Sequence, residues 1–178
     1  MRSSASADKP TRVHHPEQRI GIFIDVQNLY HTAKNLHNAR INYKELIKEI
    51  VGDRKLIRAL AYVVKTDTTF GEESFFEALK HAGIELRMKD IQIFPGGMKK
   101  ADWDVGMAVD AIRMSSFLDV VVLVTGDGDF LPLVEYLKWG AGREVEIVSF
   151  GRSSSGKLKE EADYFWNLDD YPKTLLKR

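Results

Sequence analysis

The stretch Val-Val-Val-Leu-Val-Thr-Gly-Asp-Gly-Asp-Phe at residues 120–130 decides the fold class of this chain. Five consecutive apolar residues, four of them β-branched, are typical of a strand that is buried on both faces of a sheet. Asp127 and Asp129 follow at once, so two carboxylates stand just past the end of this strand. Open α/β folds bind their ligands at that edge of the sheet, and we therefore expect a functional site there.

A second strand-like run, residues 20–24, ends in the same way. It leads into Asp25, and Asn28 follows one helical turn later. Three acidic side chains at two strand ends predict one divalent-cation site. Taken singly, each of these polar residues also has an ordinary structural interpretation, because Asp25 can end a strand while Asn28 and Asp129 are good helix caps.

Strand-like and helix-like segments alternate along the chain. We expect strands at residues 20–25, 56–64, 119–124 and 144–150, and one strand or a short hairpin within 84–94; the helices are expected at 29–37, 43–51, 70–82, 103–114 and 130–139. In helix 103–114 we expect Val105, Val109 and Ile112 to form the apolar stripe. This alternation predicts an α/β fold with right-handed crossovers. The expected architecture has three layers, with a mostly parallel sheet in the order 3-2-1-4-5 between helices on both faces.

Length and composition limit the classes of function. The 178 residues fit one domain, which we place at residues 19–170, after a flexible leader (1–18) and before a C-terminal tail (171–178). Lys and Arg together number 26, as do Asp and Glu, so no global field attracts nucleic acid. The chain has no cysteine, which excludes thiolate chemistry and favours the cytoplasm. We expect no membrane span, because no apolar run approaches the ~20 residues required.

The expected strand order makes strands 20–25 and 119–124 neighbours, so Asp25, Asp127 and Asp129 converge. Carboxylates about 4 Å apart repel by roughly 1 kcal/mol per pair in water and about 4 kcal/mol at an effective dielectric of 20, so such a cluster needs a cation. Oxygen ligands without His or Cys favour Mg²⁺ or Mn²⁺ over zinc. Asp104 joins the site if its helix points its N-terminus at the cluster, and Asp110 is expected to cap or to pair inside the fold.

Three ordered motifs carry a resemblance to a known family. They are residues 23–29 (Phe-Ile-Asp-Val-Gln-Asn-Leu), residues 104–110 (Asp-Val-Gly-Met-Ala-Val-Asp) after Lys99 and Lys100, and residues 125–130 (Thr-Gly-Asp-Gly-Asp-Phe). Together they resemble NYN domains of the LabA-like group, a branch of the PIN-like nuclease superfamily, over about residues 19–169. The resemblance implies a PIN-like (Rossmannoid) sheet. It also implies an acidic site at the positions of Asp25, Asn28, Asp104, Asp127 and Asp129.

The activity implied by this resemblance is Mg²⁺- or Mn²⁺-dependent hydrolysis of RNA by an endoribonuclease. Lys99, Lys100 and Arg152 would then contact RNA phosphates, although each also fits an ordinary solvated loop. An alternative is a non-catalytic regulatory module that binds RNA or protein and retains the acidic site, since the group includes regulatory members and the net charge is zero. A phosphatase of the haloacid-dehalogenase type ranks lower, because Gln27 replaces the second Asp that it needs. No Walker lysine or dinucleotide fingerprint is present, which leaves NTPase or NAD chemistry without support.

Overall fold

The computed structural model of the protein describes residues 14–65, 72–90, 92–97, 99–100 and 102–177. Its centre is a six-stranded sheet in which every neighbouring pair of strands is parallel. The strands lie in the order β4 (Glu85–Asp90), β3 (Lys55–Lys65), β1 (Arg19–Asp25), β7 (Val120–Val124), β8 (Glu144–Ser149) and β9 (Tyr164–Asn167). The first five reproduce the expected order 3-2-1-4-5, so the predicted fold class is confirmed. The sixth strand, β9, extends the sheet beyond the prediction.

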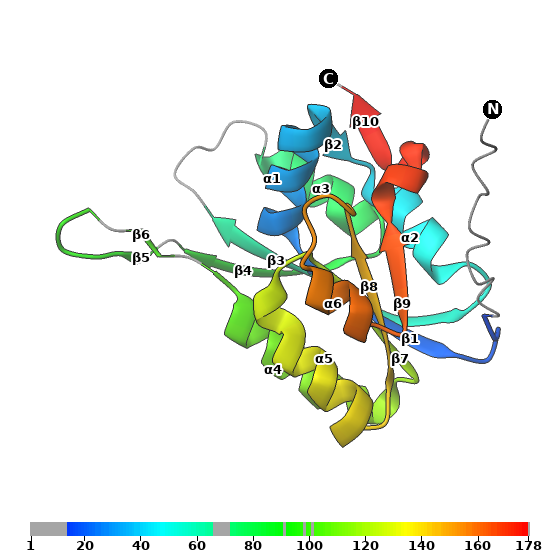
Figure 1. Cartoon of the computed structure of the whole chain (residues 1–178). Coiled ribbons are helices and arrows are strands. Elements are labelled where there is room, and N and C mark those ends of the chain that lie inside the picture. Colours follow the sequence, from blue (N-terminus) through cyan, green and yellow to red (C-terminus); the bar gives the residue numbers. More distant parts are fainter. Residues whose placement is uncertain (1–13, 66–71, 91, 98, 101, 178) are drawn as a thin grey trace, which may run out of the picture.

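Helices cover both faces of this sheet (Figure 1). One face packs against α1 (Val26–His37), α2 (Tyr43–Val51) and α3 (Glu72–His81), and the other against α4 (Asp104–Met114), α5 (Leu131–Glu135) and α6 (Gly156–Glu161). The alternation of side chains along β1 divides the core, because Ile22 and Ile24 belong to the first layer and Phe23 to the second. The domain therefore has three layers and two apolar cores.

The register between the two central strands determines where the site lies. Ile20 pairs with Val120 and Ile24 with Val124, without a shift. Both strands end at the same level, so Asp25, the last residue of β1, and Thr125, the first residue after β7, lie side by side. The chain turns to α1 on one face after β1 and to α5 on the other after β7, and ligands bind at such a switch point in open sheets.

Short elements complete the fold. Three single turns of 3-10 or π-helix flank α4 and α5: η1 (Ser115–Phe117), η2 (Gly128–Phe130) and η3 (Tyr136–Gly140). For the region 84–94 the sequence predicted either one strand or a short hairpin. The structure has β4 there and then β5 (Gln92–Ile93), which pairs with β6 (Lys99–Lys100). This hairpin projects from the body of the domain (Figure 1). Gly96 and Gly97 have positive φ values of 98° and 84°, which suit glycine at its turn.

Both ends of the described chain contact the domain. After η4 (Leu168–Asp170) and η5 (Pro172–Thr174), β10 (Leu175–Lys177) pairs antiparallel with β2 (Ala39–Ile41). These last residues were expected to form a tail. Of the expected leader, residues 1–13 lie outside the described residues, while the Gln18 amide donates to Glu144 at 2.9 Å. Among the helices of the described residues, none combines the length and the apolar character needed to cross a membrane.

The prediction that Val105, Val109 and Ile112 form the buried stripe of α4 is wrong. Val105, Val109 and Ile112 are exposed to solvent, Val105 by 76%. Met107 and Ala111 pack against the sheet instead, although the turn between them also buries Asp110. The sheet accepts this carboxylate because the Tyr62 hydroxyl donates to it at 2.8 Å. Two faces of α4 have helical apolar spacing, and the buried one carries Asp110, whose carboxylate has Tyr62 on β3 and Arg87 on β4 as partners.

Candidate metal centre

Asp25 ends β1 and begins α1. One of its carboxylate oxygens accepts a hydrogen bond from the Asn28 backbone N–H at 3.2 Å, which caps the helix. The other accepts from the Thr125 hydroxyl at 3.1 Å. The side chain is therefore held between the ends of β1 and β7. The alternative in which Asn28 caps the helix is wrong, because α1 begins at Val26 and Asp25 is its cap.

Asn28 connects α1 to the loop that follows β7. Its side-chain oxygen accepts the Gly126 N–H at 3.1 Å, so it holds the turn that carries the two later carboxylates. Thr125 completes this connection, because its buried hydroxyl donates to Asp25 and accepts the Asp127 N–H at 3.2 Å. The sequence analysis did not select Thr125. Its position directly between the apolar strand and the Gly-Asp turn is the signal that marks it.

The spacing Gly-Asp-Gly-Asp follows from the close approach of a second loop. A Cβ atom at Gly126 would lie 2.8 Å from the Ser149 hydroxyl, and one at Gly128 would lie 3.0 Å from that of Ser155. Between them, the Asp127 carboxylate accepts the Asp129 N–H at 2.9 Å and caps η2. The glycines thus let the loop after β8 press on this turn, while the cap directs Asp127 and Asp129 to one side.

Helix α4 brings the remaining carboxylate to the same place. Asp104, its first residue, offers an oxygen that lies within 4.8 Å of oxygens from Asp127 and Asp129, and those two oxygens are as close to each other. We call these three residues the acidic group. Asp25 is not one of the three, but it is near enough for its charge to raise the pKa of Asp104. The structure therefore brings all four predicted carboxylates to one edge, with three in closest contact.

The electrostatics of this edge are unfavourable for the protein alone. Burial raises the pKa of Asp104 to about 6, and the nearby carboxylates of Asp102, Asp25, Asp127 and Asp129 add to the shift. The pKa of Asp25 is also raised, mainly by burial and further by Asp127 and Asp102, against the hydrogen bonds from Asn28 and Thr125. Asp102, which the resemblance did not include, is exposed and accepts the Asp104 N–H at 3.3 Å.

These residues fit a hard divalent cation. Three carboxylates supply oxygen ligands from two separate elements, and oxygen ligands suit Mg²⁺ and Mn²⁺. The raised pKa of Asp104 is a second sign of fit, because a positive charge would relieve the repulsion that produces part of it.

The basic residues selected from the sequence belong to two other segments of the chain. Arg152 is exposed in the loop after β8, the same loop whose serines pack on Gly126 and Gly128. Lys99 and Lys100 form the short strand β6, and their side chains lie outside the described residues. Their contact with RNA stays a prediction.

The three layers and the carboxylates at the switch point of the parallel sheet define the class of protein. It is an α/β domain with an acidic site that suits a cation. The family model of the NYN domain matches residues 19–169. The chain therefore belongs to the NYN domain family, within the PIN-like nuclease superfamily, as a LabA-like member.

Several known proteins are similar to this chain. The low amplitude and bright protein LabA of Synechococcus elongatus is 25% identical over an alignment of 163 residues that covers 85% of this chain and 84% of LabA. The uncharacterized protein MJ0482 of Methanocaldococcus jannaschii is 27% identical over 150 residues, 83% of this chain but only 54% of that protein. This chain thus spans about half the length of that second relative. The crystal structure of VPA0982, a protein of unknown function from Vibrio parahaemolyticus, matches with a TM-score of 0.83 at 30% identity, over 93% of this chain and 100% of that one.

Proposed function

We propose that this protein is an endoribonuclease that hydrolyses RNA phosphodiester bonds with Mg²⁺ or Mn²⁺. The observation that carries the proposal is the acidic group, whose three carboxylates approach within 4.8 Å at the carboxyl edge of a NYN domain. Carboxylates this close repel one another, and a bound cation would offset that repulsion. The cytoplasm is the proposed compartment, because the chain has no cysteine.

The chain's own residues have distinct roles in this proposal. Asp25, Asp104, Asp127 and Asp129 would hold the cation, and Asn28 would position the turn that carries the last two. A bound divalent cation supplies a water activated for attack and stabilises the charge that develops on the phosphate and the leaving oxygen. Thr125 orients the Asp25 carboxylate by donating to it. Lys99, Lys100 and Arg152 would neutralise phosphates of the RNA on either side.

The second candidate function is a non-catalytic regulatory module that binds RNA or a protein partner and keeps the acidic site. The observation that favours it is the zero net charge, since proteins that bind nucleic acid tightly commonly carry a basic surface. In that case the acidic group would bind a cation for stability alone. The two candidates differ in turnover and agree on cation binding.

One assay separates the candidates. Purified protein is incubated with labelled single-stranded RNA, structured RNA and a generic phosphatase substrate, each with Mn²⁺, Mg²⁺ or EDTA. We expect cleavage of RNA that requires the cation, is lost in the Asp127→Asn variant and leaves the phosphatase substrate intact. RNA binding without cleavage would favour the regulatory module, and activity that Asp127→Asn retains would identify a contaminating nuclease.

A further inference from the structure

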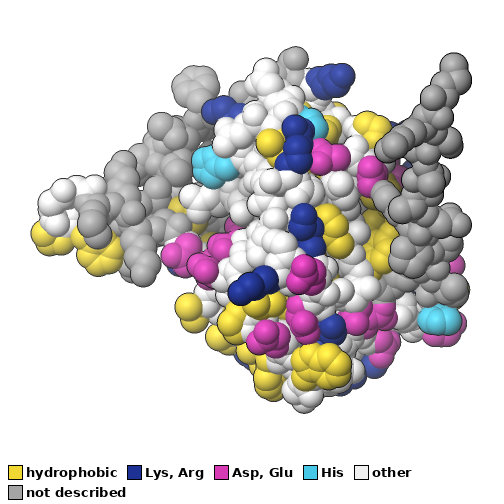
Figure 2. All heavy atoms as spheres, viewed as in Figure 1, with side chains coloured by type: hydrophobic (Ala, Val, Ile, Leu, Met, Phe, Trp, Pro, Cys, Tyr) yellow, Lys and Arg dark blue, Asp and Glu magenta, His cyan; other side chains and the backbone are white. Residues whose placement is uncertain are grey.

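An apolar groove of about 330 Å³ begins at the acidic group and runs between α4 and α5. The side chains of Asp104 and Asp129 form one end of it. The rest is lined mainly by apolar residues of α4, α5 and the first residue of η3: Val105, Ala108, Ile112, Pro132, Leu133 and Tyr136. Figure 2 shows exposed hydrophobic side chains over the same two helices. This is the apolar face of α4 that the sequence analysis had assigned to the core.

The charge of the groove limits what it can bind. Its lining residues, all of them described, include two acids and no base. A phosphate would meet only negative charge there, so the groove suits an uncharged and largely apolar group. The ring of Tyr136 adds a flat surface, since this side chain is 49% exposed at the rim. Bases stack on such aromatic rings whatever their identity.

The position of the groove indicates which group that is. A phosphodiester held at the acidic group is covalently joined, through the sugar, to a base that must lie within one nucleotide of the carboxylates. The groove starts at two of those carboxylates, and its volume is at the small end of the range for ligand pockets, enough for one nucleoside and not for several. Continuity, charge and size therefore agree on a single nucleobase.

We infer that the groove between α4 and α5 binds the nucleobase of the nucleotide adjacent to the phosphate that is cleaved, an inference that rests on the proposed function. Tyr136 stacks on one face of the base, and Val105, Ala108 and Ile112 form the aliphatic wall opposite. The groove thereby determines which phosphate enters the acidic group. The competing occupant is a second copy of the chain, because Val109 and Trp139 extend the exposed apolar surface beyond the groove.

The test removes the base and the tyrosine separately and together. Short RNAs with one abasic position, walked along the strand, are cleaved by the wild type and by Tyr136→Ala. We expect one abasic position, next to the cleaved bond, to lower the wild-type kcat/KM by roughly fivefold or more, the loss typical of one base stacked on an aromatic ring. Tyr136→Ala should lose a similar factor on intact RNA and nothing further on that abasic RNA.

Matched controls keep the result specific. Phe117→Ala removes another exposed aromatic ring, from η1 at the opposite end of α4, and should cleave both RNAs as the wild type does. Ile112→Ala tests the opposite wall and should reproduce the coupling if Tyr136→Ala does not fold. Thermal unfolding checks each variant, and sedimentation velocity measures its oligomeric state.

Each outcome has one meaning. Cleavage with no coupling between the abasic position and Tyr136 overturns this inference and leaves the nuclease proposal standing. If the protein does not cleave, the same cycle is measured by equilibrium binding in Mn²⁺: coupling there supports the groove and refutes the hydrolysis, and its absence overturns both. A groove variant that changes the sedimentation coefficient, without coupling to the base, would show that the groove binds a second copy instead.

Discussion

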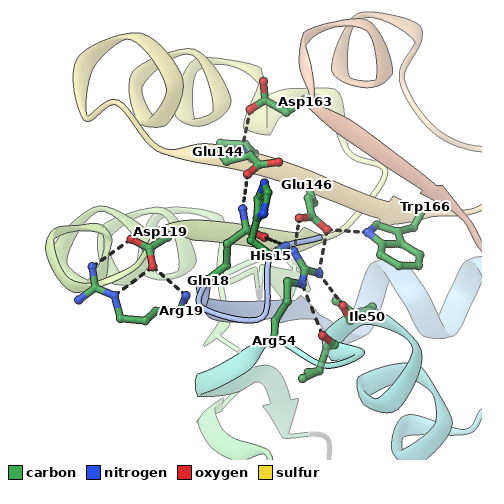
Figure 3. A network of polar contacts seen from close by, with 12 residues as sticks. His15, Gln18, Arg19, Ile50, Arg54, Asp119, Glu144, Glu146, Asp163 and Trp166 are labelled. Atoms are coloured by element: carbon green, nitrogen blue, oxygen red, sulfur yellow. Dashed lines mark hydrogen bonds and ion pairs between the residues drawn. The ribbon is translucent and has the colours of Figure 1, made fainter. Parts of the chain in front are cut away.

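The two edges of the central sheet treat carboxylates in opposite ways. At the amino edge, Arg19 binds Asp119 through both side-chain oxygens, at 3.0 Å each, and holds the pKa of that carboxyl down at about 2 (Figure 3). At the carboxyl edge, burial and neighbouring acids raise the pKa of Asp104 to about 6. The residue type is the same and the strands are the same. The partners differ, because acids meet bases at one edge and other acids at the other.

A buried ion pair between Arg54, just before β3, and Glu146, in the amino-terminal half of β8, makes the contrast stronger. Arg54 and Glu146 are fully buried, and the guanidinium donates to both carboxylate oxygens, at 2.6 and 3.2 Å (Figure 3). The Ile50 carbonyl accepts from Arg54, and the Trp166 indole donates to Glu146. Arg19, Asp119, Arg54 and Glu146 thus each have a partner of opposite charge. Among the described residues, the protein stabilises its fold with ion pairs at the amino edge and gathers acids at the carboxyl edge, where a cation can supply the opposite charge.

The largest expected effect is a loss of stability when the buried ion pair of Arg54 and Glu146 loses one of its charges. Arg54→Met should lower the free energy of unfolding by about 3 to 5 kcal/mol, because it leaves the Glu146 carboxylate buried without its counter-charge. Urea unfolding at constant slope measures the loss. The double variant Arg54→Met with Glu146→Leu should recover most of it, since it removes both charges. A loss below about 1 kcal/mol in the single variant would show that this ion pair does not stabilise the fold.

The next effect concerns catalysis at the carboxyl edge. If the protein cleaves RNA, Asp25→Asn should lower the rate by roughly 10² to 10³, the loss typical of one electrostatic stabiliser of the transition state. The fold should persist, because asparagine caps a helix as well as aspartate does. Asp119→Asn makes the same change at the amino edge and should leave the rate unchanged. Equal losses in the two variants would mean that the edges do not differ in function.

Cation binding should stabilise the folded protein by a smaller amount. At a Mn²⁺ concentration 100 times the dissociation constant, the gain is about 2.7 kcal/mol, because the ion binds only the folded state at this site. Thermal unfolding in Mn²⁺ and in EDTA gives the shift. Asp127→Asn should shrink it and Asp119→Asn should preserve it. If Asp127→Asn responds as the wild type does, the ion binds elsewhere.

The smallest effect is a pH dependence of opposite sign at the two edges. Without cation, the folded state binds a proton at Asp104 up to about pH 6, whereas the ordinary pKa is 3.8. The unfolding free energy therefore falls as pH rises between these values. We expect about 1 kcal/mol, because solvent screens this partly exposed group. Asp119 acts in reverse: its stabilisation is present above its ordinary pKa of 3.8 and is lost as pH falls towards 2.

Urea unfolding in EDTA across this pH range measures both contributions. The difference in unfolding free energy between the wild type and Asp104→Asn should change between pH 4 and 6, and the difference for Asp119→Asn should change only below pH 4. Parallel pH profiles for the two variants would contradict the contrast between the edges.

Much of the fold could be predicted, because it depends on patterns within single segments. The apolar runs at residues 20–24 and 120–124 mark strands that are buried on both faces, and their unshifted pairing follows once they are neighbours. Strand β9 was not predicted, because its four residues are too few to show the apolar pattern of a strand. Its place at the edge depends on β8, with which it pairs from Tyr164 to Asn167.

The candidate site divides in the same way. The positions of Asp25, Asp127 and Asp129 after two buried strands placed them at one edge before any contact was known. Thr125 was not predicted as a site residue. Its hydroxyl bonds to Asp25, 100 positions earlier, and to Asp127, two positions later, and the periodicity of a sequence contains no sign of such bonds. Asp102 lies outside the motifs that carry the resemblance, and its influence on the pKa of Asp104 depends on the distance between the two carboxylates in the folded chain.

The sequence by itself determined the class of fold and the edge at which acids gather, because these follow from local periodicity and from the direction of the chain at each strand end. The order of the central strands was expected from the doubly wound fold that this alternation predicts. Only the tertiary structure decided which face of α4 is buried. The helix has two apolar stripes, and the buried one carries Asp110, whose carboxylate has Tyr62 and Arg87 as partners. The stripe of Val105 and Ile112 is therefore left at the surface beside the acidic group, a position that depends on contacts between distant residues and that no single segment specifies.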